Sequence, residues 1–219
     1  ADLQLHREAC QAHLSLGDIY RQLGDLQRAI ASYDRVMKMC LPYVNESATA
    51  KSYGPLLVKA YTGSGQVQQD LQRFGLAMTL HEKAAQQIAR LTSQYPDDAE
   101  IQLLTIHHLS VALAQRDIIA REQMLRETIR LTSNRATRFP GYSEFGACVA
   151  RCRAALGQLL RDVGRISDAE QQFRAALSQQ TQLAEVLANN PSHAYRLAAT
   201  KHHFALMLQD CGRGEDAES

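Results

Sequence analysis

Closely spaced histidines and cysteines are the residues of this chain whose types could do chemistry, and metal binding is the chemistry they suggest. They form two histidine doublets and one cysteine pair: His107-His108, His202-His203, and Cys148 with Cys152. Adjacent residues of a helix point about 100° apart, so neither doublet can chelate a metal ion by itself. Nothing near the cysteine pair supplies two further ligands. We therefore expect no metal site, and buried, reduced thiols that act as small apolar residues.

Sequence motifs of enzymes are missing from the chain. It has no phosphate loop of the Gly-x-x-x-x-Gly-Lys-Ser/Thr type, and its one glycine cluster, Gly63-Ser64-Gly65, does not follow a strand pattern. The acidic pair Asp97-Asp98 is better explained by helix capping than by general acid–base catalysis. We therefore expect no catalytic residue and no cofactor.

Composition limits the classes of partner. The 219 residues are 45% hydrophobic, 21% charged and 6% aromatic, with a formal net charge of +1. This balance gives no reason to expect nucleic acid or an anionic membrane as a partner. No apolar run approaches the roughly 18 residues of a membrane span, and the first residues lack signal-peptide character, which predicts a cytoplasmic protein. Plentiful Ala, Leu, Gln and Arg favour helix nearly throughout.

A set of small residues recurs along the chain and must be positioned by recurring elements: Gly17, Gly65, Ala112, Gly157 and Ala205. Their period of about 45 to 48 residues lies in the range that indicates a solenoid of stacked units. In each copy, apolar residues at helical spacing flank a short break, which carries Gly24, Gly164 or Gly212. Each copy is therefore predicted to be a helix, a tight turn and a second helix.

The small residue lies about two turns before the break, where a larger side chain would hold the second helix away. We expect the second-helix alanines, such as Ala29 and Ala169, to be its contacts, with Tyr33 and Phe173 filling the space beside them. Pro55 falls inside a first helix, so it predicts a kink or a helix that begins after it.

Together these features predict an all-α solenoid of about four and a half antiparallel helix pairs. We expect one domain over residues 1–219. The approximate repeat boundaries are 1–44, 45–95, 96–139, 140–190 and 191–219, the last of them truncated.

The pattern Leu16-Gly17-x-x-Tyr20 with Gly24, Ala29 and Tyr33 resembles the signature of the tetratricopeptide repeat family. The family repeat has about 34 residues, so this chain is similar to a long-repeat variant, and we expect the second helix of each pair to take most of the extra length. The stretch 187–191 followed by 195–198 resembles the region after the catalytic domain of some large bacterial serine/threonine protein kinases. None of the kinase motifs is present.

The resemblance implies that the solenoid is right-handed and that its first helices line a concave groove. By register, the following residues face it: Gln11, Leu14, Asp18, Lys59, Thr62, Gln66, Ile106, Leu109, Leu113, Arg151, Ala154, Gln158, Ala199, His202 and Leu206. The Lys and Asn pattern with which some relatives clamp an acidic chaperone tail is missing. The mixture of aliphatic and amide side chains fits a partner helix or extended segment with apolar anchors.

A polar feature near the end of each first helix keeps the same register: Arg21-Gln22, Gln69-Asp70, Arg116-Asp117, Arg161-Asp162 and Gln209-Asp210. We call it the rail. Its arginines could orient a bound peptide through a carboxylate or phosphate. Alternatively, Arg and Asp of neighbouring repeats pair on the surface, each pair contributing about 0 to 1 kcal/mol.

The sequence therefore predicts a protein-interaction module without enzymatic activity, which binds a protein or peptide through the groove and the rail. One alternative is a regulatory or structural repeat region that packs in cis on a kinase domain of a longer signalling protein. A second is self-association through the truncated C-terminal repeat, whose apolar face includes Phe204 and Leu206. An enzyme or small-ligand sensor would need a titratable residue with a strongly shifted pKa inside the superhelix.

Overall fold

The computed structural model describes residues 2–107, 113, 116–186 and 191–213. Over these residues the regular structure is entirely helical, and the helices pack in adjacent pairs. The predicted all-α fold of paired helices is thereby confirmed. The chain separates into two compact units, residues 1–115 and 116–219, and each is described by itself. The expected single domain over residues 1–219 stays a prediction.

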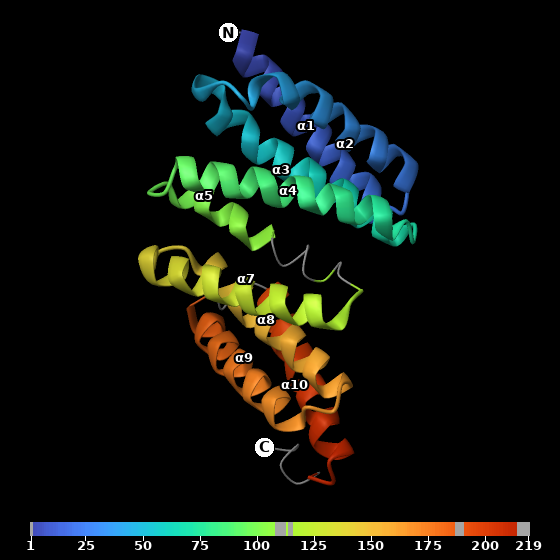
Figure 1. The fold of residues 1–219 in the computed structure, drawn as a ribbon, viewed down its shortest axis with the longest axis vertical. Coiled ribbons are helices and arrows are strands. Elements are labelled where there is room, and N and C mark those ends of the chain that lie inside the picture. The colour runs from blue at the N-terminus through green and yellow to red at the C-terminus, as the bar shows by residue number, and fades with distance from the viewer. Residues whose placement is uncertain (1, 108–112, 114–115, 187–190, 214–219) are drawn as a thin grey trace. The chain divides into compact units, whose positions relative to one another are not determined.

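The first unit is built around the long central helix α3. Its helices are α1 (Asp2–Gln22), α2 (Leu26–Cys40), α3 (Ser47–Asp70), α4 (Phe74–Gln94) and α5 (Ala99–Leu103), with 3₁₀ turns at Leu41–Tyr43 and Leu104–His107. Helix α2 packs on both α1 and α3, and α3 packs on α4 (Figure 1). Helix α3 therefore has neighbours on two sides and carries much of the core.

The second unit repeats this arrangement with four helices. They are α7 (Ile118–Arg138), α8 (Ser143–Asp162), α9 (Ile166–Val186) and α10 (Pro191–Asp210). Helix α8 packs on α7 and on α9, and α9 packs on α10. The second helices α2, α4, α7 and α9 have 15, 21, 21 and 21 residues, and the first helices α1, α3 and α8 have 21, 24 and 20. Both helices of a pair are long, so the expectation that the second takes most of the extra length is wrong.

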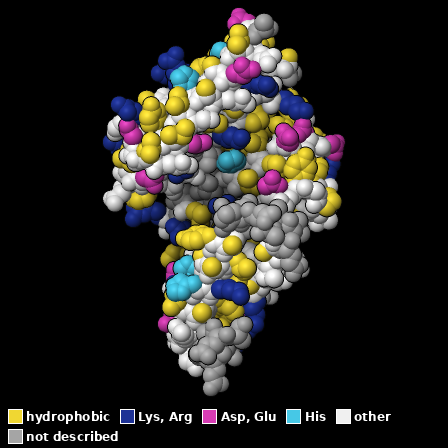
Figure 2. Space-filling model, turned by 180° about the vertical axis from the view of Figure 1, so that it is seen from behind, with side chains coloured by type: hydrophobic (Ala, Val, Ile, Leu, Met, Phe, Trp, Pro, Cys, Tyr) yellow, Lys and Arg dark blue, Asp and Glu magenta, His cyan; other side chains and the backbone are white. Residues whose placement is uncertain are grey.

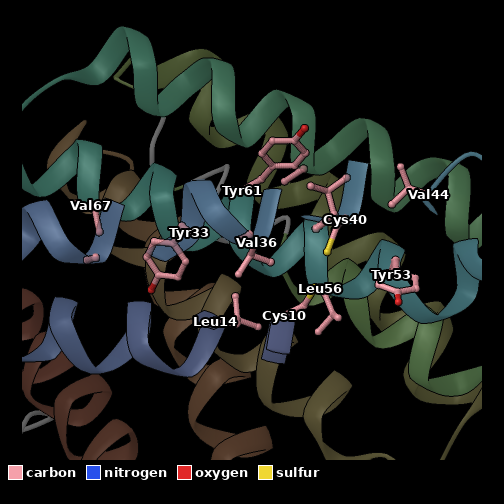
Figure 3. Packing of buried hydrophobic residues seen from close by; sticks show 14 residues of the cluster. Cys10, Leu14, Tyr33, Val36, Cys40, Val44, Tyr53, Leu56, Tyr61 and Val67 are labelled. Carbon is pink, nitrogen blue, oxygen red and sulfur yellow. The ribbon is translucent and has the colours of Figure 1, made fainter. Parts of the chain in front are cut away.

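The ring of Tyr33 fills the predicted small-residue slot of the first repeat. Figure 3 shows Tyr33 among the buried residues of the first unit. A Cβ atom added to Gly17 on α1 would lie 2.6 Å from the ring, and one added to Gly63 on α3 would also lie 2.6 Å away. Tyr33 is fully buried between the two glycines. Gly17 is thus needed as predicted, and the atoms nearest to its slot belong to the Tyr33 ring.

The same position of later second helices carries a different side chain. Tyr33, His81, Leu125 and Phe173 each stand eight residues after the residue that precedes their helix. All four are fully buried. A Cβ atom added to Gly65 would lie 2.7 Å from His81, and one added to Gly157 would lie 3.1 Å from Phe173. The slot therefore recurs with the fold while its occupant changes.

The tight turns between paired helices require a left-handed backbone. Gly24, Gly164 and Gly212 adopt φ angles of 77°, 79° and 71°, as expected for glycines that end a helix. In the second repeat this place is taken by Gln72, with φ 59°. A side chain in this conformation crowds the carbonyl that follows it.

The substitution Gln72→Gly is expected to raise the free energy of unfolding by about 1 kcal/mol, because it removes the side chain from a left-handed residue. Urea unfolding followed by circular dichroism measures the change. The matched control is Gln69→Gly within α3, which should lower stability by about 1 kcal/mol. An unchanged or lower unfolding midpoint for Gln72→Gly would contradict the prediction.

The structure also tests two expectations about where helices begin. The Asp98 carboxylate accepts a hydrogen bond from the backbone N–H of Ile101 at 3.1 Å, so Asp98 caps α5 as predicted. Helix α3 begins at Ser47 and continues through Pro55. The alternative of a helix that begins after Pro55 is therefore wrong.

Candidate functional site: a groove between α1 and α3

An open groove of about 640 Å³ lies between the first helices of the first two repeats. Its lining residues come from α1, α3 and the turn after α5: Gln11, Leu14, Ser15, Asp18, Leu56, Lys59, Thr62, Gly63, Gln66 and His107. Leu14 and Leu56 are 9% and 6% exposed and supply an apolar floor. Most of the other lining residues are polar, so the groove combines an apolar base with hydrogen-bonding walls.

Helical spacing explains why these residues gather. On α1 the lining positions 11, 14, 15 and 18 follow the three- and four-residue steps of one helix face, and positions 59, 62, 63 and 66 do so on α3. Six residues that the sequence places toward the groove line this hollow: Gln11, Leu14, Asp18, Lys59, Thr62 and Gln66. That any of them binds a partner stays a prediction.

Asp18 is held in place by the core residue beneath it. The Tyr33 hydroxyl donates a hydrogen bond of 2.6 Å to Asp18 Oδ1. Burial, together with the acceptor Asp18, raises the pKa of Tyr33, so the hydroxyl keeps its proton at physiological pH. Asp18 is otherwise exposed, and its second carboxylate oxygen can accept from a partner.

Lys59 supplies the opposite charge within the same groove. It is exposed on α3, two turns before Gln66. The Thr62 hydroxyl donates to the carbonyl of Val58 at 2.9 Å, so its proton is used inside the helix. The groove thus offers one carboxylate, one ammonium group and amide side chains over an aliphatic floor. This set suits the reversible binding of a polypeptide segment.

The remaining predicted binding residues lie mostly on the second unit. Arg151 and Gln158 are on α8, and His202 and Leu206 are on α10; Arg151, His202 and Leu206 are exposed and Gln158 is half-buried. Arg161 and Leu206 help to line a second hollow of about 660 Å³ in this unit. Leu113 is exposed in the first unit, and Leu109 lies outside the described residues.

Two contacts of the rail join residues that are close together in the chain. Arg161 Nη2 lies 2.9 Å from Asp162 Oδ1 of the same helix. Asp117 Oδ1 accepts from the backbone N–H of Ala120 at 2.7 Å and so caps α7. The role of Arg21, Arg116 and Arg161 in orienting a peptide stays a prediction.

Two ion pairs that join neighbouring repeats involve residues that the sequence analysis missed. Arg165 lies 2.9 Å from Glu122, and Arg213 lies 2.7 Å from Glu170. Each arginine directly follows a turn glycine, and each pair spans 43 residues. Hydrogen bonds from Arg126 and then Arg165 lower the pKa of Glu122, and hydrogen bonds from Arg213 and then Arg174 lower the pKa of Glu170. The shared separation of 43 residues identifies the pairs once the fold is known, and exposed ion pairs of this kind contribute little to stability.

The paired helices and the open groove define a helical-repeat protein. Models of the tetratricopeptide repeat match residues 11–41, which include α2 and the second half of α1, and residues 149–178, which include most of α8 and the first half of α9. The two matches support a tetratricopeptide repeat protein. A comparison with curated proteins found no match.

The described residues also bear on other kinds of site. None of the helices that the structure describes combines the length and the apolar character needed to cross a membrane. Within the described ranges, no three or more His, Cys, Asp or Glu side chains come together as metal ligands would. On the face drawn in Figure 2, side chains of both charges are interspersed with hydrophobic ones.

Proposed function

We propose that the chain is a protein-interaction module that binds a segment of a partner protein in the groove between α1 and α3. Tetratricopeptide repeats generally mediate protein–protein interactions, which supports this class of function. The observation that carries the proposal is the Asp18 carboxylate, fixed by Tyr33 and placed in one groove with the apolar floor of Leu14 and Leu56.

The groove chemistry specifies the segment. An aliphatic or aromatic side chain would cover the floor, and a Lys, Arg or backbone N–H would donate to Asp18. Lys59 would donate to an acidic group of the segment. The side-chain amides of Gln11 and Gln66 can donate to and accept from the backbone of an extended chain. The preferred ligand is therefore a short segment with an apolar anchor between a basic and an acidic residue.

We propose a separate contact surface on the second unit, formed by the exposed Arg151, His202 and Leu206 together with the rail residue Arg161. Arg116 belongs to this rail by sequence register. We place the interaction in the cytoplasm, because the five cysteines are free thiols, as a reducing compartment would keep them.

Selection from a random-peptide display library on the immobilised chain tests the proposal. We expect enriched peptides to carry the apolar anchor with flanking charges. The variant Asp18→Asn keeps an acceptor for Tyr33 but removes the charge, so it should weaken these peptides about tenfold, as should Lys59→Glu. The matched control Glu82→Gln, at an exposed site on α4, should leave affinity unchanged.

Enriched peptides that bind both groove variants as tightly as the unchanged chain would overturn the proposal. If no peptide is selected, the better explanation is a repeat region that packs in cis on a kinase domain of a longer chain. Circular dichroism of each variant shows that a loss of binding does not come from unfolding.

A further inference from the structure

An unpartnered apolar stripe runs the length of α1. Its members follow one another at steps of four and three residues: Leu5, Ala9, Ala12, Leu16, Ile19 and Leu23. This spacing places them on one side of the helix. All six are exposed, with Leu5 at 65%, Ile19 at 49% and Leu23 at 75%. We call this set the α1 stripe.

The corresponding face of α3 is buried. The residues 48 positions later are Tyr53, Leu57, Ala60, Ser64, Val67 and Leu71. The first five are at most 2% exposed, and Leu71 packs against the same core cluster. Side chains of α2, including Val36 and Cys40, belong to this cluster (Figure 3). The second helix of the preceding repeat therefore covers this face of α3.

The second unit shows the same relation. The residues 140 positions after the α1 stripe are Phe145, Val149, Cys152, Leu156, Leu159 and Val163 on and just after α8. The first five are at most 7% exposed. Helix α7, the second helix of the preceding repeat, packs on α8. In both units, the face that corresponds to the α1 stripe is thus covered by the second helix of the preceding repeat.

The covering helices share a side-chain pattern at positions i, i+3 and i+7. It reads Tyr33, Val36 and Cys40 on α2, and Leu125, Thr128 and Thr132 on α7. All six residues are buried. In both helices a large side chain is followed by a β-branched one and then by a small one. A helix that packs on the α1 stripe should carry the same three kinds of side chain.

Among the helices that the structure describes, the second helices with this pattern are already packed on a first helix. The covering residues of α2 and α7 are already buried on α3 and α8. On α9 the corresponding Phe173, Ala176 and Gln180 are buried too, and α9 packs on α10. The α1 stripe therefore calls for a helix from elsewhere.

We propose that the α1 stripe is a docking site for an amphipathic helix, supplied from outside residues 1–219, that carries this i, i+3, i+7 pattern. The helix lies along α1 as α2 lies along α3. The site is distinct from the groove, because at about 100° per residue the groove positions 11, 14, 15 and 18 of α1 are centred about 130° around the helix from the α1 stripe. The two sites can be tested separately.

The probe is a fluorescent peptide with the sequence of residues 25–43, which contains the covering pattern of α2, with Cys40→Ser to prevent disulfide formation. Fluorescence anisotropy measures its binding to the complete chain. We expect saturable binding that Ile19→Glu weakens at least tenfold. Leu3→Glu should have no effect, because Leu3 is equally exposed on α1 but lies off the stripe. A peptide that also carries Val36→Asp should not bind.

Absence of binding overturns the proposal. Equal binding to the Ile19→Glu variant also overturns it, because the peptide would then be exchanging with α2 on α3. Analytical ultracentrifugation tests whether a second copy of the chain occupies the stripe instead. A dimer of the unchanged chain that Ile19→Glu abolishes would assign the stripe to that second copy. Since Ile19 is about half exposed, the variant is expected to fold, and circular dichroism checks this.

Discussion

A Gly17→Val variant is expected to lose about 3 kcal/mol of its free energy of unfolding. Any Cβ atom at this position would lie 2.6 Å from Cε1 of Tyr33. The ring cannot retreat, because Gly63 of α3 closes its other side and the Tyr33 hydroxyl is bonded to Asp18. Helices α1 and α2 must therefore separate or the ring must leave its position. Urea unfolding followed by circular dichroism measures the loss.

Two glycine substitutions serve as controls for this prediction. A Cβ atom added to Gly75, within α4, meets no atom within 4 Å, so Gly75→Ala should be neutral or stabilising by up to about 1 kcal/mol. At Gly157 the nearest atom of Phe173 is 3.1 Å away, so Gly157→Ala should cost less than Gly17→Val. A Gly17→Val variant that unfolds at the same urea concentration as the unchanged chain would contradict the argument.

The helical pairs could be predicted because their marks recur at a fixed interval. Gly17 and Gly157 stand at the same place in two copies, and Gly24 and Gly164 end the first helix in both. A recurring small residue inside a helix and a recurring glycine after it have a physical cause in close packing and in left-handed backbone. The same register also placed Asp18 and Gln66 toward one groove, where the structure finds them.

Other features could not be predicted because they depend on which partner a residue finds. Leu16 and Ile19 have the spacing of buried residues, as Ser64 and Val67 have on α3, yet only the latter are covered. Periodicity tells which residues share a face, but not whether another helix lies on it. The pair Arg165–Glu122 is a similar case, since the chain has many Arg and Glu residues and a separation of 43 selects among them only after the fold is known.

The substitution His81→Leu is expected to raise the free energy of unfolding by roughly 1 to 3 kcal/mol at neutral pH. Among the four side chains that occupy this position of the second helices, His81 is the most polar one. His81 is fully buried, and neither ring nitrogen has a hydrogen-bond partner. Buried polar atoms without partners lose their hydrogen bonds to water and gain none in return. Leucine fits the site because Leu125 holds the same position in α7 and is also fully buried.

The gain from His81→Leu should grow as the pH falls. Burial lowers the pKa of His81 in the folded chain, while an unfolded histidine has a pKa of about 6.5. Below about pH 6.5 the unfolded chain therefore binds a proton that the folded chain does not, and stability is lost by up to about 1.4 kcal/mol per pH unit until the lowered pKa is passed. Urea unfolding of both proteins from pH 7.5 to 5 measures the difference. The reciprocal variant Leu125→His should lose more stability in acid than the unchanged chain does. If the free energy of unfolding of His81→Leu exceeds that of the unchanged chain by the same amount at every pH, His81 does not titrate on unfolding.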